Sequence, residues 1–281
     1  MLTKCGALVL ALAGTLCGGG AAQTDSARTS SGLWFARQGQ GDPLVLVHGS
    51  NLDNRSFDWI VAPLAAGRRV VVMDLRFHGR STDPGGPVSW ERDLLEVLDA
   101  LQLERASLLG HSLGAQVVVD FALAHPERVD RLVVVGPSVS GYVSATMPAG
   151  FDAVLRAVRA GDLHGAAAAM ADMPAMGLVA AVERRPFVRQ LFQDNAGLFR
   201  QDPARLVRPS PPATERLEHL ASPLLVLVGD SDLTYGPQVA DLLVQRVRGA
   251  RRVTLRRCGH LAPVDCPDQV IRAVEEFLRR E

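Results

Sequence analysis

The sequence predicts an α/β protein with a mostly parallel sheet, helices on both faces of the sheet, and a long helical insertion. Short runs rich in Val and Leu, typical of strands buried on both faces, alternate with helical patterns from about residue 42 onward. The alternation stops between 138 and about 220, where only helical stretches are visible, and then resumes. Of the 281 residues, 47% are hydrophobic and 21% are charged, which is the profile of a globular protein with a large core.

The N-terminal segment differs from the rest of the chain. One early cation, Lys4, precedes an apolar run and a stretch of small residues, so 1–22 is interpreted as a secretory signal peptide cleaved after Ala22. The apolar run is too short to form a transmembrane helix. A buried N-terminal helix is the alternative interpretation. Since Lys4 is the only lysine in the chain, cleavage would leave no lysine for Schiff-base or Ser-Lys chemistry. We therefore expect a secreted or periplasmic protein.

Residues 23–137 are expected to form the first part of the core. Ser89 is a suitable N-cap for the amphipathic helix that follows it. The expected strands are 43–50, 68–75, 105–112 and 129–137, and the expected helices are 56–67, 89–103 and 113–126.

The insertion, 138–220, is expected to be helical, with helical patterns at 150–162 and 178–195. An insertion this long between two strands often forms a lid over a site. Its Ala- and Met-rich part, 166–181, suits an adaptable apolar pocket, although helix core is the other interpretation. The core resumes over 221–281, with expected strands at 222–232 and 250–258 and expected helices at 237–247 and 268–280.

The sequence Gly110-His111-Ser112-Leu113-Gly114 fits G-x-S-x-G and lies between a predicted strand and a predicted helix. A strand that turns at once into a helix forces the middle residue into strained backbone geometry, where neighbouring side chains would clash. Such a turn exposes the serine hydroxyl above the sheet. Ser112 is therefore the candidate nucleophile, and an ordinary tight turn is the alternative.

A serine hydroxyl is a weak nucleophile and needs a base that an acid orients. Sites of this kind deliver the serine, the acid and the histidine in that chain order. His260 follows the last predicted strand and is the candidate base. Asp230 and Asp232 both lie in the loop after the apolar run "LLVLVG" (224–229), and Asp232 is preferred because the residue further from the strand end can reach toward the histidine.

The strand at 43–50 ends in His48-Gly49, which would bring the backbone N–H of Ser50 to the reaction centre. With the N–H of Leu113, it would form an oxyanion hole. His48 is expected to support this loop structurally. Asn51 is either an additional donor or a plain turn residue.

These segments together resemble the α/β-hydrolase family over most of the chain after the N-terminal segment. The resemblance lies in "HGS" at 48–50, "GHSLG" at 110–114, "GDSD" at 229–232 and "CGH" at 258–260. It implies that the insertion is a helical cap that shapes the substrate pocket. Because the nucleophile is Ser rather than Asp, the similarity to epoxide hydrolases and haloalkane dehalogenases stops at the fold. Serine-based members of the family include carboxylesterases, lactonases, carbon–carbon bond hydrolases and cofactor-free haloperoxidase-like enzymes.

Cys258 and Cys266 flank His260 and are expected to form a disulfide that stiffens the histidine loop. Two free thiols are the alternative. A zinc site that adds His260 and Asp265 to the two cysteines is disfavoured, because the metal would consume the base that Ser112 needs. A redox role is disfavoured because the cysteines are too far apart for an exchange motif.

The expected function is that of an exported serine hydrolase that cleaves carboxylic esters through an acyl-enzyme. A lactonase or carbon–carbon bond hydrolase would use the same three residues, and a receptor of low turnover could keep the same fold. The formal net charge is zero and no basic block is present, which disfavours nucleic acid and anionic membrane surfaces as partners. We expect a small-molecule substrate, no metal, no organic cofactor and no stable insertion into a membrane.

Overall fold

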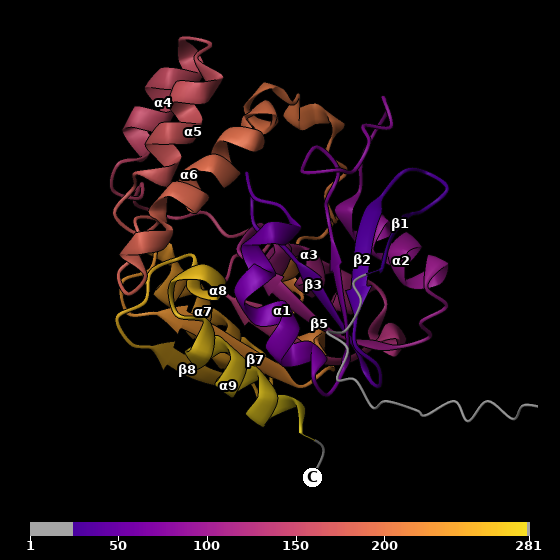
Figure 1. Ribbon diagram of the computed structural model, residues 1–281. Helices are drawn as coiled ribbons and strands as arrows, with labels where there is room; N and C mark the ends of the chain where they lie inside the picture. The colour runs from indigo at the N-terminus through magenta and orange to yellow at the C-terminus, as the bar shows by residue number, and fades with distance from the viewer. Residues whose placement is uncertain (1–24, 280–281) are drawn as a thin grey trace, which may run out of the picture.

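The computed structural model describes residues 25–279, and the signal peptide expected at 1–22 lies outside them. Eight strands form one sheet in the order β1-β2-β4-β3-β5-β6-β7-β8 (Figure 1). Neighbours from β4 to β8 are parallel, whereas β1 and β2 pair antiparallel at one edge. The strands are β1 Asp25–Arg28, β2 Trp34–Gln38, β3 Pro43–Val47, β4 Arg69–Met73, β5 Ala106–His111, β6 Val129–Val135, β7 Leu224–Gly229 and β8 Arg251–Leu255.

The mostly parallel sheet is confirmed, but β1 and β2 were not predicted. All four residues of β1 are exposed, so this edge strand lacks the apolar run on which the prediction depended. The central strands are different, since every residue of β5 and β7 is buried. A strand covered on both faces needs apolar residues at every position, and this is the pattern that the sequence shows there.

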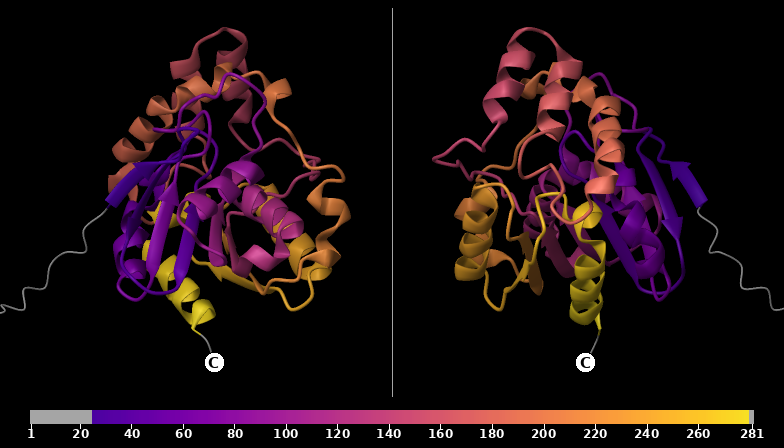
Figure 2. Two further views of the ribbon diagram at one scale, coloured as in Figure 1. Left: turned by 90° about the vertical axis from the view of Figure 1, so that its right-hand side faces the viewer. Right: turned by 60° about the vertical axis from the view of Figure 1, so that its left-hand side comes forward.

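Helices cover both faces of the sheet (Figure 2). Alternate residues of β3 point to opposite faces, so that Val45 and Val47 pack in one hydrophobic core while Leu44 and Leu46 pack in the other. The first core contains α2 Trp90–Ala100, α3 Leu113–Ala124 and α7 Tyr235–Arg246, and the second contains α1 Asp58–Ala65 and α9 Pro267–Leu278.

Ser89 caps α2 as expected, because its side chain accepts a hydrogen bond from the Arg92 N–H. Short helical segments complete the connections. These are η1 Asn54–Phe57, η2 Pro126–Arg128, η3 Val182–Arg184, η4 Ala196–Arg200, η5 Pro203–Arg205, η6 Ala213–Glu215, η7 Leu217–His219 and α8 Ala262–Asp265.

The insertion between β6 and β7 forms a helical cap that lies above the sheet in Figure 1. Its helices are α4 Phe151–Arg159, α5 Leu163–Ala171 and α6 Arg185–Asp194. They share a third core with Leu52, Leu233 and Leu261, which come from loops of the sheet domain. The helical pattern at 178–195 becomes a regular helix only from Arg185, because Pro186 lies in its first turn, where proline is tolerated. In the part of the chain that the structure describes, no helix is both long and apolar enough to cross a bilayer.

Candidate active site

Ser112 lies at the sharp turn between β5 and α3. Its backbone has φ 53° and ψ −113°, a strained conformation for a residue with a side chain. A Cβ on Gly110 would lie 2.2 Å from the Gly114 carbonyl oxygen, and a Cβ on Gly114 would lie 1.9 Å from the Val47 carbonyl oxygen. Only glycine at both positions therefore allows this turn, which places Ser112 at the N-terminus of α3.

The structure brings together the three side chains that were predicted to be nucleophile, base and acid. The distance from Ser112 Oγ to His260 Nε2 is 2.9 Å, and the distance from His260 Nδ1 to Asp232 Oδ1 is 2.6 Å. The His260 and Asp232 side chains are 2% and 1% exposed. Because the carboxylate accepts from Nδ1–H, Nε2 is left free to accept the serine proton.

Asp230, the alternative acid, has a different position. Its carboxylate accepts hydrogen bonds from the N–H groups of Arg257 and Cys258 at 2.8 and 3.1 Å. These two backbone donors hold the pKa of Asp230 below its usual value. Asp230 thus fixes the loop that carries His260, while Asp232 contacts the histidine itself.

The His260 loop is also tied to the cap. The His260 N–H donates to the Ala175 carbonyl oxygen at 2.8 Å. Asp265 is buried and accepts from the Gly259 N–H at 2.7 Å and from the N–H groups of Ala180 and Ala181 at 2.8 and 3.2 Å. The sequence suggested Asp265 only as a metal ligand, and among residues 25–279 no cluster of His, Cys, Asp and Glu is placed to hold a metal ion.

Cys258 and Cys266 close the loop around His260. Their sulfur atoms are 2.01 Å apart, at bonding distance, and their Cα atoms are 5.9 Å apart. Both side chains are buried in the core between the sheet and α9. The pair therefore joins the start of the loop, after β8, to the N-terminus of α9.

The two residues predicted to supply the oxyanion donors both lie close to Ser112. A Cβ on Gly49 would lie 3.1 Å from Ser112 Cβ, so the turn that contains Ser50 packs against the serine. Leu113 is the first residue of α3, where a backbone N–H has no partner within the helix. His48 supports this turn, because its Nε2 accepts from the Leu75 N–H at 3.0 Å.

Asn51 does not present its amide to the serine. Its Nδ2 donates to the Asn195 carbonyl oxygen at 3.2 Å, which connects the turn after β3 to the end of α6. Of the two interpretations, the structure therefore favours a turn residue, with an added contact to the cap.

His111 and Tyr235 complete the surroundings of Ser112. His111 Nε2 lies 2.9 Å from the His260 carbonyl oxygen, and burial lowers the pKa of His111 to about 3, which keeps its ring neutral. Burial and the Asp232 carboxylate raise the pKa of Tyr235 to about 12, while an interaction with the Ser112 side chain acts in the opposite direction. Tyr235 was not predicted as a site residue. Its position three residues after Asp232, at the start of a helix, could have indicated that it lies near the site.

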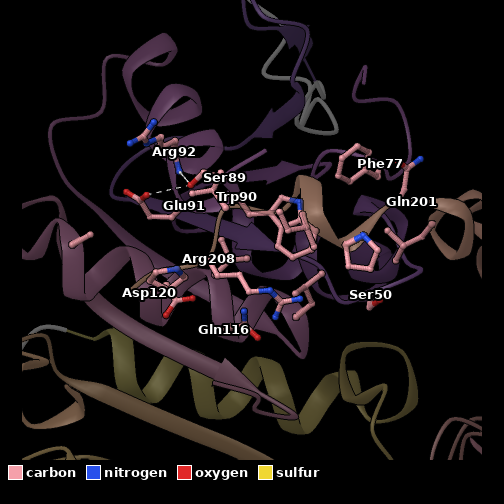
Figure 3. A pocket seen from close by; sticks show the side chains of 18 of the residues that line it. Ser50, Phe77, Ser89, Trp90, Glu91, Arg92, Gln116, Asp120, Gln201 and Arg208 are labelled. Carbon is pink, nitrogen blue, oxygen red and sulfur yellow. Dashed lines mark hydrogen bonds between the residues drawn. The ribbon is translucent and has the colours of Figure 1, made fainter. Parts of the chain in front are cut away.

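Ser112 and His260 open into an apolar cavity of about 440 Å³ beneath the cap. The Met-rich part of the insertion contributes to it, since Met170, Met173 and Met176 all line the cavity. A second cavity of about 490 Å³, drawn in Figure 3, lies between α2, α3 and the last part of the insertion. Ser50 and Leu198 line both cavities, so the two meet beside the predicted oxyanion donor.

Comparison with known proteins agrees with this geometry. Residues 44–273 match the model of the alpha/beta hydrolase family. The chain is 28% identical to 2-hydroxy-6-oxo-2,4-heptadienoate hydrolase of Pseudomonas putida, over 86% of this chain and 91% of that protein. It is 27% identical to esterase YbfF of Escherichia coli, over 86% of this chain and 94% of that protein. A thermophilic esterase from Thermogutta terrifontis, solved with malate bound, superposes with a TM-score of 0.72 at 25% identity, over 92% of this chain and 98% of that chain.

Proposed function

The chain belongs to the alpha/beta hydrolase family, and we propose that it is an exported serine hydrolase that cleaves carboxylic esters through an acyl-enzyme. The observation that carries the proposal is the hydrogen-bonded series Ser112–His260–Asp232, which opens into an apolar cavity. A neutral histidine beside a serine hydroxyl supplies a general base, and the cavity offers an apolar half of an ester a place to bind.

In this mechanism Ser112 Oγ attacks the ester carbonyl carbon while His260 Nε2 removes the hydroxyl proton. The Asp232 carboxylate stabilises the imidazolium that forms. The backbone N–H groups of Ser50 and Leu113 donate to the oxyanion of the tetrahedral intermediate. His260 then gives its proton to the departing alkoxide, which leaves as the alcohol. A water molecule, deprotonated by His260, hydrolyses the acyl-enzyme and restores the Ser112 hydroxyl.

A lactonase or carbon–carbon bond hydrolase is the second candidate. It is supported by the similarity to the Pseudomonas putida hydrolase, whose name gives a hydroxy-oxo-dienoate as its substrate. These reactions would use the same three side chains, and only the fit of the substrate in the cavity separates them from ester hydrolysis.

Export rests on the sequence of residues 1–22 and on the two cysteines, Cys258 and Cys266, that would remain after cleavage. If the segment is a signal peptide, protein recovered from the periplasm or medium begins at Gln23. Protein that keeps Met1 and stays in the cytoplasm would contradict the export part of the proposal without affecting the hydrolase part.

The enzymatic proposal is tested with p-nitrophenyl esters from acetate to palmitate, using wild type and Ser112→Ala. Wild type is expected to turn over at least part of the series, and Ser112→Ala is expected to lose about 10³-fold or more in kcat. A hydroxy-oxo-dienoate and a lactone series run in parallel test the second candidate. Slow, stoichiometric acylation of Ser112 without turnover would indicate a receptor of this fold.

A further inference from the structure

The second cavity has more polar side chains in its lining than the first, although most of its lining surface is apolar, and one of its walls is fixed. Figure 3 shows Trp90, Gln116 and Arg208 directed into it, with Ser50 at one end. The Val88 N–H donates to the Arg205 carbonyl oxygen, and the Val207 N–H donates to the Val88 carbonyl oxygen, both at 2.8 Å. The segment that carries Arg208 is thereby held against the start of α2.

Three donors that border this cavity lack acceptors. Arg208 is an exposed residue, and within residues 25–279 no hydrogen bond or ion pair engages its guanidinium. Arg216 Nε and Trp90 Nε1 are both shielded from solvent without a hydrogen-bond partner. Unpaired buried donors such as Arg216 Nε and Trp90 Nε1 are costly, so a cavity that they border is suited to a ligand that accepts hydrogen bonds.

The acidic side chains that border the cavity are already engaged. Glu91 bonds to His125, Asp202 accepts from the Ala204 N–H at 2.9 Å, and Asp120 accepts from Ser140 Oγ at 2.6 Å. Burial raises the pKa of Asp120 to about 6, while the hydrogen bond from Ser140 and the charge of Arg216 act in the opposite direction. Among the described residues Arg208 has no acidic partner, and Arg216, whose charge also acts on Asp120, keeps an unpaired Nε.

We infer that this cavity binds a carboxylate at the far end of the acyl half of the substrate, held by Arg208 and Arg216. The inference rests on the proposed function, since it places an ester carbonyl at Ser112. His260 returns its proton to the leaving oxygen and lines only the apolar cavity, so the alcohol half belongs on that side. The acyl half then extends past Ser50 into the second cavity, where guanidinium groups match the geometry of a carboxylate.

The test compares two esters of equal length, mono(4-nitrophenyl) adipate and 4-nitrophenyl 5-carbamoylpentanoate, after subtraction of the rates without enzyme. Their acyl chains end in a carboxylate and a neutral amide, respectively. We expect wild type to prefer the carboxylate ester by about tenfold or more in kcat/KM, mainly through KM. Arg208→Gln and Arg216→Gln should each reduce this ratio, and the double variant should bring it close to one.

Arg92→Gln is the matched control, because Arg92 borders the same cavity but its guanidinium points away from it in Figure 3. This variant should keep the wild-type ratio. Equal turnover of the two esters by wild type would overturn the inference and leave the proposed function standing. A ratio that survives the double variant, or that falls equally in Arg92→Gln, would also overturn it. If the enzyme hydrolysed neither of these esters and none of the p-nitrophenyl series, the proposed function and the inference would both be wrong.

Discussion

Asp230 and Asp232 are two residues apart, and only one of them faces His260. Asp232 lies 2.6 Å from the imidazole, whereas Asp230 accepts two backbone N–H groups of the neighbouring loop. The same residue type thus has two different environments within one turn. This makes the pair a natural comparison for separating an effect on chemistry from an effect on loop structure.

We expect Asp232→Asn to lower kcat by about 10³–10⁴-fold, because an amide cannot stabilise the imidazolium and favours the wrong tautomer of His260. Asp230→Asn should leave kcat within about twofold and lower Tm by about 2–4 °C, since it loses part of its bonding to Arg257 and Cys258. Steady-state kinetics and thermal unfolding of both variants make the comparison. A larger loss of kcat in Asp230→Asn than in Asp232→Asn would contradict the assignment of the acid.

The buried His111 is expected to make the free energy of unfolding decrease at acidic pH. In the folded state burial lowers its pKa to about 3, while in the unfolded state it titrates near 6.5. As the pH falls below about 6.5, His111 takes up a proton in the unfolded state but not in the folded state, so the free energy of unfolding decreases. The loss approaches about 1.4 kcal/mol per pH unit until the pH nears 3.

His111→Gln removes this titration and keeps a donor for the His260 carbonyl oxygen. The difference in unfolding free energy between wild type and variant should therefore narrow between pH 6 and 4, as measured by denaturant titrations. The difference is the useful quantity, because burial raises the pKa values of Asp58, Asp93 and Asp120 and these act in the opposite direction. The exposed His219→Gln change is the control, and a difference that stays constant with pH would refute the argument.

The three residues that the sequence predicted to act together do lie in contact, because each prediction depended on local signals. Ser112 lies in a five-residue motif, and the other two follow the ends of parallel strands, which meet at one edge of the sheet. The role of Asp265 could not be predicted in this way. Its partners Ala180 and Ala181 are more than eighty residues away and reach it only through the fold of the cap.

At the scale of elements, the loop from β8 to α9 is held at several points. Asp230 binds its start, Asp265 binds Gly259, and the Cys258–Cys266 pair closes it around the histidine. These restraints act on the position of His260 more than on the core of the sheet. Losing the Cys258–Cys266 link, which spans both sides of His260, should therefore disturb catalysis before it disturbs folding.

Reduction of the Cys258–Cys266 pair should lower kcat several-fold while lowering Tm by only a few degrees, because Asp230 and Asp265 still hold the loop. The Cys258→Ser/Cys266→Ser double variant should behave like the reduced protein and lose its response to reductant. Activity and thermal unfolding with and without dithiothreitol provide the measurement. Thiol titration of denatured, unreduced protein from the periplasm or medium should find no free thiols, and two titratable thiols would refute the disulfide.

Burial explains only part of what the sequence predicted, because the mostly exposed β8 was predicted while β2, whose first three residues are buried, was missed. Strands such as β5 and β7 are buried at every position, and their composition alone indicates them. β1 has no buried residue, so nothing in its composition separates it from a loop. α5 was not delimited, because its alanines are compatible with any packed segment and its end at Ala171 depends on the turn that follows.

At the scale of the whole molecule, the cap is built into the sheet domain rather than attached beside it. Their shared core contains cap residues such as Phe192 together with Leu52, Leu233 and Leu261 from the sheet domain. The His260 N–H and the Asp265 carboxylate both bond to the backbone of the insertion. We therefore expect the cap and the sheet domain to unfold in one cooperative transition.

Asn195 is the side chain that most directly tests this coupling. It is 3% exposed, its Oδ1 accepts from the Gly79 N–H at 2.8 Å, and its Nδ2 donates to Asp53 Oδ2 at 2.9 Å. Asn195→Ala leaves the Gly79 N–H without its acceptor and removes one donor from Asp53, which keeps its bonds to Arg55, so it should cost about 1–2 kcal/mol in unfolding free energy. Gln190→Ala, on the exposed side of the same helix, is the control and should cost less than about 0.5 kcal/mol.

If the cap and the sheet domain form one unit, Asn195→Ala lowers a single calorimetric transition, and the calorimetric and van't Hoff enthalpies remain equal. KM should rise as well, because the Asn195 side chain holds the end of α6 against Asp53, and the nearby Leu52 and Phe192 line the apolar cavity. Two separate transitions in wild type would show that the cap folds independently of the sheet. A variant that loses stability with no change in KM would show that Asn195 supports the fold without positioning the cap over Ser112.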